Sequence, residues 1–303
     1  MELEFKPVVA GDIDRLRPFY GLRPNKTCDS VVLDSFLWKD YYHVQCAVSE
    51  GRAVLWLMEK DGQVSTAMPL CREEDLPYFF QQMVDYFSGV LHKPFYISLA
   101  DEEAVQCLNL DPALFEVEEQ VDLKDYLYSG EELRKLEGKK FVKKRNHLNG
   151  FKRTYEGRYE YRRLCCSDRH EVWQFMERWR QHKEEVGAME LSLDYEVAGI
   201  HDILKNCSSL YVRMAGVYID GQLEAFTIGS LNVRENMAVI HIEKANPEIR
   251  GLYQFINQQF LINEFPEAEL VNREDDVGME GLRKAKMSYC PIGFARKYMV
   301  RER

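Results

Sequence analysis

An arginine and a glycine, Arg250 and Gly251, precede a segment in which large apolar residues recur at helical spacing. A glycine that opens a helix leaves backbone N–H groups free at the positive end of the helix dipole, so a phosphate or pyrophosphate can bind there. The Arg250 guanidinium adds a bidentate donor for the same anion. The dipeptide alone equally suits an ordinary loop between a strand and a helix. Its position after three predicted strands favours the phosphate site.

Acyl transfer requires a base that takes a proton from the acceptor and a donor that stabilises the developing oxyanion. Acidic residues near this turn are candidates for the base. Glu243 lies at the end of the third predicted strand and is the candidate base, acting directly or through water. It could equally be a strand carboxylate paired with Lys244 or Arg213. Asp276, with Asp275 beside it, lies in a polar loop and could orient the incoming amine or cap a helix.

The segment GLRKAKMSY places Arg283 and Lys286 three residues apart, on one face of a short predicted helix. Two cations there could hold a phosphate or the carboxylate of an acceptor. Tyr289 is a candidate acid for the leaving group. His241 lies in an apolar strand and is interpreted as a buried core histidine. No pattern such as G-x-S-x-G supports a nucleophilic serine or cysteine, and the histidine and cysteine spacings predict no metal site.

Residues 131–153 form a basic segment in an acidic chain. They carry nine Lys or Arg against three Glu, although the whole chain has a formal net charge of −10. Such a stripe is a candidate surface for a polyanion, and it could also be an ordinary solvated helix face. The predicted polyanion-binding residues are Lys139, Lys140, Lys143, Lys144 and Arg145.

Two parts of the sequence show the same order of predicted elements: three strands, helix, strand, helix, strand. Dipeptides that favour two-residue hairpins separate the early strands, at Glu50-Gly51, Asp61-Gly62 and Asp220-Gly221. The first part comprises strands 44–49, 52–59 and 64–70, helix 73–87, strand 95–99, helix 102–108 and strand 115–123. The second comprises strands 210–219, one from 222, and 237–244, a helix from 252, strand 269–271, helix 279–287 and strand 294–300.

This order predicts an α+β protein with three regions: an N-terminal domain over 1–128, a basic linking helix over 129–155, and a C-terminal domain over 156–303. Ser129 followed by Glu132 forms a capping box, so the linking helix is expected to start at Gly130. After the third strand of the first part come three consecutive acids, residues 73–75, which would repel a pyrophosphate. We therefore expect the donor site in the second part alone.

Composition places the chain among globular proteins, with 46% hydrophobic residues in 303. No apolar run approaches the ~18 residues of a membrane span, and the first residues do not resemble a signal peptide. The expected location is therefore the cytoplasm. The eight cysteines are scattered without C-x-x-C spacing, which predicts free thiols rather than disulfides.

Two segments, SGEELRKLEGKKFVKKRNHLNGFKR and NREDDVGMEGLRKAKMSYCPIGF, resemble the C-terminal domain family of the bacterial phosphatidylglycerol lysyltransferases. The resemblance implies two GNAT-like domains with mixed, largely antiparallel sheets, related to the FemABX peptidyltransferases. It also implies transfer of an acyl or aminoacyl group to an amine or hydroxyl, from acyl-CoA or aminoacyl-tRNA as a co-substrate and with no tightly bound cofactor. In FemABX-like proteins the segment similar to the one with Arg283 and Lys286 lies at the donor pocket. The family's lipid substrate belongs to members with a membrane domain, so lipid lysylation is not expected here.

The basic segment favours tRNA as the donor, and the Arg250–Gly251 turn favours coenzyme A. A non-catalytic RNA-binding or scaffold protein that retains the fold is the alternative from another functional class, because the turn lacks the second glycine of the acyltransferase motif.

Overall fold

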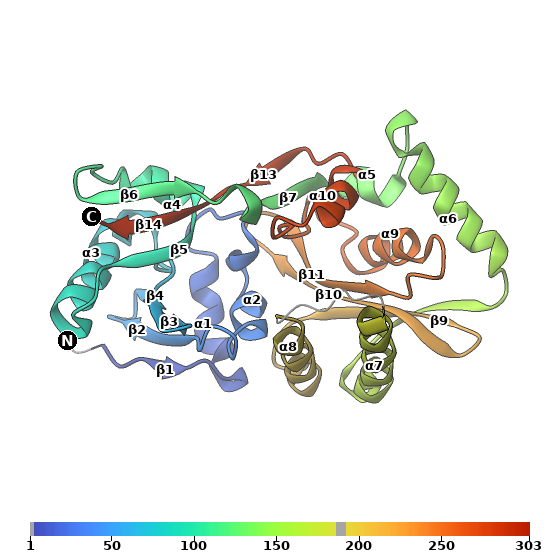
Figure 1. The fold of residues 1–303 in the computed structure, drawn as a ribbon, viewed down its shortest axis with the longest axis horizontal. Helices are drawn as coiled ribbons and strands as arrows, with labels where there is room; N and C mark the ends of the chain where they lie inside the picture. The colour runs from blue at the N-terminus through green and yellow to red at the C-terminus, as the bar shows by residue number, and fades with distance from the viewer. Residues whose placement is uncertain (1–2, 186–191) are drawn as a thin grey trace.

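The strands of the chain form three sheets, and the helices pack on their faces (Figure 1). The structure is a computed structural model that describes residues 3–185 and 192–303. The first sheet has the order β1-β2-β3-β4 and is antiparallel throughout. Its strands are β1 (Lys6–Pro7), β2 (Gln45–Ser49), β3 (Ala53–Lys60) and β4 (Gln63–Ser65).

The second sheet has seven strands in the order β13-β7-β12-β11-β10-β9-β8. Only the β11–β12 pair among them is parallel. These strands are β7 (Asp125–Ser129), β8 (Tyr159–Arg163), β9 (Arg213–Ile219), β10 (Gln222–Asn232), β11 (Met237–Ala245), β12 (Leu270–Asn272) and β13 (Gly293–Ala295). The predicted meander is thus confirmed, and both residues of its turn, Asp220 and Gly221, have the positive φ of a two-residue hairpin.

The third sheet joins segments that are far apart in the sequence. Its strands are β5 (Tyr96–Asp101), β14 (Lys297–Glu302) and β6 (Phe115–Glu119), with β14 in the middle. An isolated parallel bridge between Thr66 and Ile97 connects this sheet with the first. Strand pairing therefore crosses the predicted domain boundary at residue 128 in both directions, because β7 pairs in the seven-stranded sheet and β14 pairs with strands of the first half.

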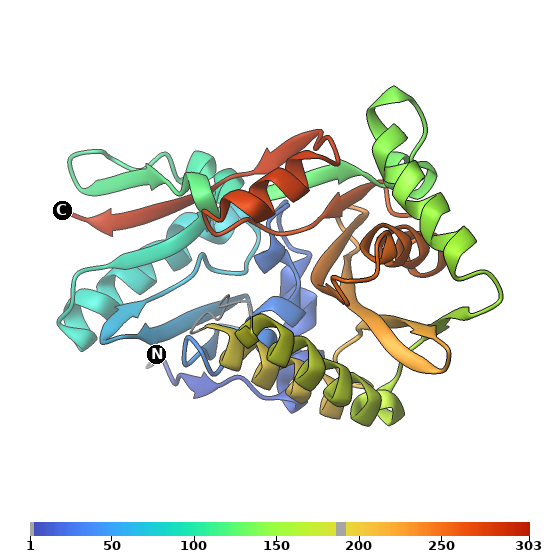
Figure 2. The ribbon, with the colours of Figure 1, turned by 45° about the vertical axis from the view of Figure 1, so that its right-hand side comes forward.

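Helices cover both faces of the seven-stranded sheet (Figures 1 and 2). On one face, Phe255 and Phe260 pack with Phe151 in one apolar core. On the other, Phe175 contacts Phe226 edge to face. The helices of the chain are α1 (Ile13–Tyr20), α2 (Val32–Leu37), α3 (Leu76–Tyr86), α4 (Glu102–Leu108), α5 (Gly130–Lys135), α6 (Val142–Thr154), α7 (Arg169–Glu185), α8 (Ser192–Asn206), α9 (Leu252–Glu264) and α10 (Glu280–Met287).

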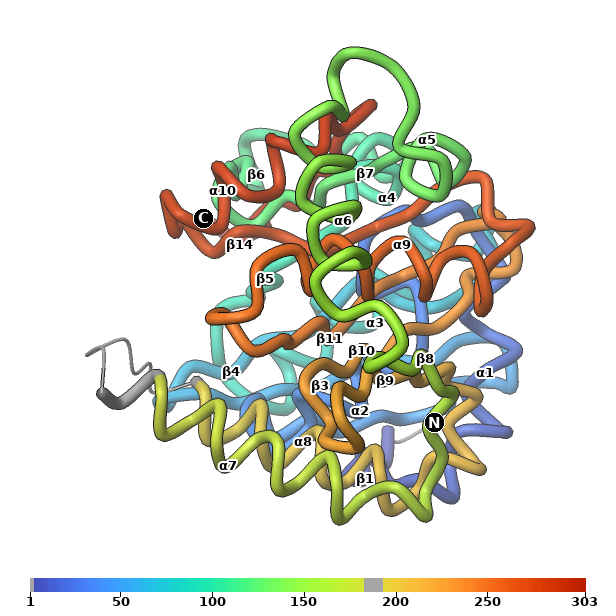
Figure 3. Tube along the Cα trace, turned by 90° about the vertical axis from the view of Figure 1, so that its right-hand side faces the viewer, coloured from blue at the N-terminus to red at the C-terminus, as the bar shows by residue number. Residues whose placement is uncertain are grey.

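The basic segment forms two helices, so the prediction of one linking helix over 129–155 is wrong. The start is as predicted, since Ser129 Oγ accepts a hydrogen bond from the Glu132 backbone N–H and α5 begins at Gly130. The helix then ends at Lys135, because Leu136 and Gly138 both have positive φ. The second helix, α6, packs across α9 (Figure 3).

The cysteines also differ from the prediction in one respect. Cys166 and Cys207 form a disulfide that ties the start of α7 to the end of α8, whereas the other six cysteines are free, as expected. The expectation failed here because cysteine spacing does not reveal which thiols tertiary packing brings together. Within residues 3–185 and 192–303, none of the helices is both long and apolar enough to cross a membrane.

Candidate active site

Glu243 lies near the end of β11 and forms a largely buried ion pair. Its carboxylate accepts hydrogen bonds from Arg273 Nη2 at 2.9 Å and from Asn257 Nδ2 at 2.8 Å. The Glu243 and Arg273 side chains are only 10% and 14% exposed. Burial alone would lower the pKa of Arg273, but the Glu243 carboxylate together with Tyr128 and Tyr289 outweighs it, and the pKa is raised. The partner of Glu243 is therefore Arg273, which follows β12, rather than either of the basic residues considered from the sequence.

Tyr289 and Lys144 lie beside this ion pair. The Arg273 guanidinium carbon is 4.8 Å from the centroid of the Tyr289 ring, and Lys144 Nζ is 3.8 Å from the same centroid. Lys144 also donates a hydrogen bond to Ser288 Oγ at 2.6 Å. We call Glu243, Arg273, Tyr289 and Lys144 the Arg273 cluster. It unites three predicted site residues from three separate segments of the chain.

The electrostatics of the cluster perturb two of its members. Burial lowers the pKa of Lys144 to about 8, and the positive charge of Arg273 contributes to the same shift. Burial raises the pKa of Tyr289 to about 12, so the phenol keeps its proton at neutral pH. Arg273 Nη1 is buried and has no hydrogen-bond partner among the described residues. The cluster thus combines one amine whose pKa is about 8, one phenolic proton and one buried guanidinium nitrogen whose N–H groups no described residue accepts.

The Arg250–Gly251 turn lies beneath α6. Gly251 has a φ of +89°, and a Cβ added to it would lie 2.3 Å from the backbone oxygen of His147 on α6. Glycine is therefore required at this position both by conformation and by space. Burial lowers the pKa of His147, and the charges of Arg250 and Lys144 lower it further. Lys144, His147, Arg250 and Arg273 consequently form a basic region where α6 meets the start of α9.

Asp276 and Arg283 bind each other rather than standing free. Arg283 donates to both carboxylate oxygens of Asp276, from Nε at 2.9 Å and from Nη2 at 2.8 Å. The Tyr126 hydroxyl and the Gly278 backbone N–H, at 2.9 Å, also donate to Asp276. Hydrogen bonds from Arg283, together with those from Tyr126 and Gly278, hold the pKa of Asp276 well below its usual range, although burial acts in the opposite direction. This pair fixes the loop before α10.

Lys286 stabilises the neighbouring part of the same loop. It is buried, and its ammonium donates to the backbone oxygens of Arg273, at 2.6 Å, and Asp275. Its charge is therefore directed at carbonyl groups of the segment that carries the Arg273 cluster.

The remaining basic residues divide into exposed and engaged side chains. Lys139 and Lys143 are exposed to solvent. Lys140 forms an ion pair with Glu132 at 2.7 Å, and Arg145 donates to backbone oxygens of the α5–α6 connection, including that of Gly138 at 2.8 Å. Of the predicted polyanion-binding residues, Lys139 just before α6 and Lys143 on it are thus free to face a polyanion, together with the half-buried Lys144.

One polar chain was not predicted from the sequence. His241 is buried, as expected, and its Nε2 lies 2.7 Å from Ser230 Oγ while its Nδ1 lies 2.9 Å from Glu274 Oε1. Both Ser230 and His241 are buried in the sheet. This series of hydrogen bonds therefore orients Glu274 and does not present a nucleophile. No local signal could have revealed it, because the three residues come from β10, β11 and the segment after β12.

Comparison with known proteins shows which proteins the chain resembles. A relative from Mycoplasmoides gallisepticum, itself uncharacterised, is 28% identical over 178 residues, which are 58% of this chain and 56% of that protein. The chain thus spans just over half the length of this curated relative. A crystal structure of a Bacteroides thetaiotaomicron protein of unknown function has a TM-score of 0.89 and 26% identity, with both chains covered completely.

The fold class predicted from the sequence is confirmed. A C-terminal domain assigned to a lysylphosphatidylglycerol synthetase of Agrobacterium fabrum has a TM-score of 0.69 at 17% identity, covering 96% of this chain and 91% of that one. The chain has the same GNAT-like fold, with mixed and mostly antiparallel sheets. The family model described as phosphatidylglycerol lysyltransferase, C-terminal, matches residues 22–301, and the chain belongs to this family.

Proposed function

We propose that the chain transfers an aminoacyl group from aminoacyl-tRNA to an amine or hydroxyl acceptor, with the reacting ester held at the Arg273 cluster. The observation that carries the proposal is the buried Glu243–Arg273 ion pair beside the Tyr289 phenol, with Lys144 over the same ring and Arg250 close enough to affect His147 on α6. Cations in a partly buried site attract phosphates and stabilise a developing oxyanion.

Each member of the cluster has a distinct role in this proposal. Arg273 binds the carbonyl oxygen through Nη1, which lacks a protein partner. Tyr289 supplies the proton for the leaving ribose hydroxyl, since its high pKa keeps it protonated. Glu243 orients Arg273, and both of its oxygens already accept hydrogen bonds, so it acts on the acceptor only through water.

Asp276, Arg283 and Lys286 have a supporting role in the proposed mechanism. Their charged groups bind one another or backbone oxygens. We therefore assign them to positioning the segment 273–278, rather than to contact with the donor's phosphates.

Acyl-CoA is the second candidate donor, supported by the Arg250–Gly251 turn. Against it, α6 packs its backbone on this glycine, with the His147 oxygen where a Cβ would project. The tRNA donor has additional support, because Lys139 and Lys143 extend the basic surface away from the cluster.

The test combines binding and transfer. Aminoacyl-tRNA binding is measured at about 50 and about 200 mM salt, where a phosphate-dominated complex weakens steeply. Lys139→Ala and Lys143→Ala should each reduce the salt slope by about one, whereas Lys93→Ala, an exposed lysine of the N-terminal half, should not. Transfer is then followed with a radiolabelled aminoacyl group and three acceptor classes: amines, soluble alcohols and phosphatidylglycerol vesicles, the last because of the family's name.

Each outcome is decisive for one assignment. Salt-sensitive binding with transfer that is lost in Arg273→Lys supports the proposal. Binding of acyl-CoA without binding of tRNA favours coenzyme A as the carrier of the donor group. Binding of tRNA without transfer to any acceptor class favours the non-catalytic RNA-binding alternative.

A further inference from the structure

A cavity of about 100 Å³ lies in the N-terminal half, away from the Arg273 cluster. Three rings, those of Trp38, Tyr42 and Trp56, line it and are called here the aromatic wall. For comparison, a cavity of about 150 Å³ admits benzene in a well-studied lysozyme variant. The space therefore suits a short aliphatic or small polar group.

The charges that face the cavity are predominantly negative. Three acids and one arginine line it, and the arginine is already neutralised, since Arg23 forms a bidentate ion pair with Asp101 with both contacts at 2.6 Å. Asp29 and Asp34 also line it, and within residues 3–185 and 192–303 neither forms an ion pair with a lysine or arginine. The hydrogen-bond neighbour of Asp34 is itself a carboxyl group, that of Asp29. Two adjacent carboxyl groups in a cavity require either a shared proton or a bound cation.

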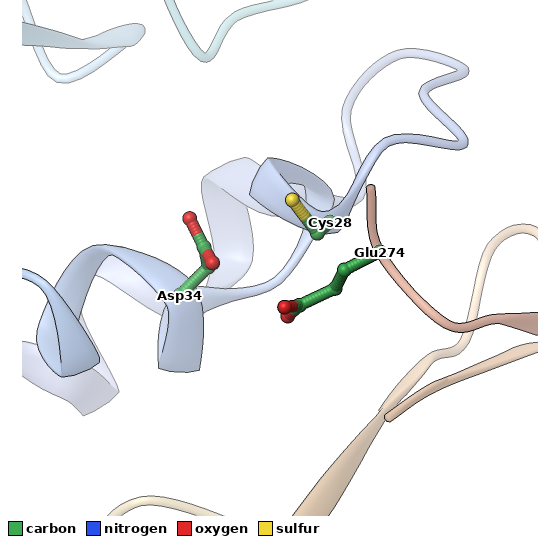
Figure 4. A group of neighbouring side chains, drawn as sticks. All are labelled: Cys28, Asp34 and Glu274. Atoms are coloured by element: carbon green, nitrogen blue, oxygen red, sulfur yellow. The ribbon is translucent and has the colours of Figure 1, made fainter. Parts of the chain in front are cut away.

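A third carboxylate reaches the same place from the other half of the chain. Glu274, held by His241, has its carboxylate within 4.8 Å of ligand atoms of Asp34 and Cys28 (Figure 4). Burial raises the pKa of the Asp34 carboxyl, and the charges of Asp29 and Glu274 raise it further. The charge of Lys297 acts on Asp34 in the opposite direction, but its ammonium is bound to Asp125 at 2.7 Å. A positive ligand would supply a further cation for these carboxyl groups.

We propose that this cavity binds the primary ammonium group of a small aliphatic amine, with Asp29 and Asp34 as its anionic partners and the aromatic wall around its alkyl chain. Ammonium groups are attracted both to carboxylates and to aromatic faces. Asp34 also lies near the segment after β12, in which Arg273 belongs to the proposed transfer site and the Glu274 carboxylate approaches Asp34. In so far as the proposed function holds, the ligand is the acceptor, and its bound ammonium is an anchor while a second amine or a hydroxyl reacts.

Direct binding tests the proposal independently of any transfer. Calorimetry with 1,4-diaminobutane and n-butylamine should show saturable binding at one site, and 1-butanol, of similar size but neutral, should not bind. Trp38 and Trp56 line the cavity, so tryptophan fluorescence should change on the same titration.

Matched variants separate the site from surface charge. Asp34→Asn should weaken amine binding at least tenfold. It should not lower the unfolding midpoint, because the carboxyl group that it removes is repelled by its acidic neighbours. Asp29→Asn should weaken it similarly, and Asp85→Asn, an exposed aspartate on α3, should leave it unchanged.

Three results would overturn the proposal. They are equal binding of 1-butanol, unchanged amine affinity in Asp34→Asn, and binding of Mg²⁺ or Zn²⁺ at this place without amine binding. Amine binding in a protein that transfers no aminoacyl group would leave this inference standing and would refute the proposed function alone.

Discussion

The titration of Lys144 gives a sharp test of the basic region on α6. Burial lowers the pKa of its amine to about 8, and the neighbouring Arg273 contributes. A phosphate placed next to Lys144 would favour the charged form, so a polyanion should bind better when this amine is protonated. We therefore expect tRNA affinity to fall as pH rises through about 8. Lys144→Arg should remove this dependence, since a guanidinium stays charged at these pH values.

The magnitude follows from the pKa. Roughly nine-tenths of the Lys144 amines carry a proton at about pH 7, and roughly one-tenth at about pH 9. If the complex requires the charged form, affinity should fall about tenfold over this range, or ~1.4 kcal/mol in binding free energy. Burial and the charges of Arg250 and Lys144 lower the pKa of His147, so Lys144 is the group of this region expected to lose its charge over this range.

The assay is fluorescence anisotropy with labelled, deacylated tRNA at constant ionic strength, because the aminoacyl ester hydrolyses in base. Lys143→Arg is the matched control, as Lys143 lies on the same helix and is exposed. A tenfold loss of affinity that persists in Lys144→Arg would refute the reasoning, as would a pH-independent affinity in the unmodified protein.

Two further predictions concern stability and are measured by urea unfolding. Gly251→Ala should cost about 2–5 kcal/mol, because it combines a positive φ with a Cβ 2.3 Å from the His147 oxygen. Gly138 has a similar φ but open space around it, so Gly138→Ala should lower the free energy of unfolding by only about 1–2 kcal/mol. Equal losses of stability in the two variants would show that α6 does not pack on the turn as described. Arg273→Met should cost about 3–5 kcal/mol because it leaves Glu243 buried without its partner, and adding Glu243→Leu should recover part of that loss. A double variant less stable than the single one would contradict the ion-pair assignment.

Local features of the fold were accessible from the sequence. The turn at Asp220-Gly221 was correctly predicted because the dipeptide itself favours positive φ, and α9 because apolar residues recur along one helical segment. The start of α5 was also predicted correctly, because the two residues of its capping box, Ser129 and Glu132, lie within one helical turn. In each case, residues close in sequence contain the whole physical cause.

The long-range features were not accessible. Glu243 was recognised as a candidate, but its partner Arg273 lies 30 positions away and reaches it only through the parallel β11–β12 pair. Lys144 was chosen for its charge alone, and its low pKa arises from tertiary burial that the sequence does not show. Whether these side chains bind a donor remains a prediction.

The placement of β14 in the middle of the third sheet has a consequence for how the chain folds during synthesis. Both neighbours of β14, the strands β5 and β6, are complete by Glu119, but β14 begins at Lys297. At ribosomal rates of about 5–20 residues per second, the intervening stretch of about 180 residues takes roughly 10–35 s to synthesise. For that time two strands of the first half lack the partner between them, and their unpaired edges are open to mispairing. The third sheet of the N-terminal half can therefore be completed only after β14 has been synthesised, when both halves are present.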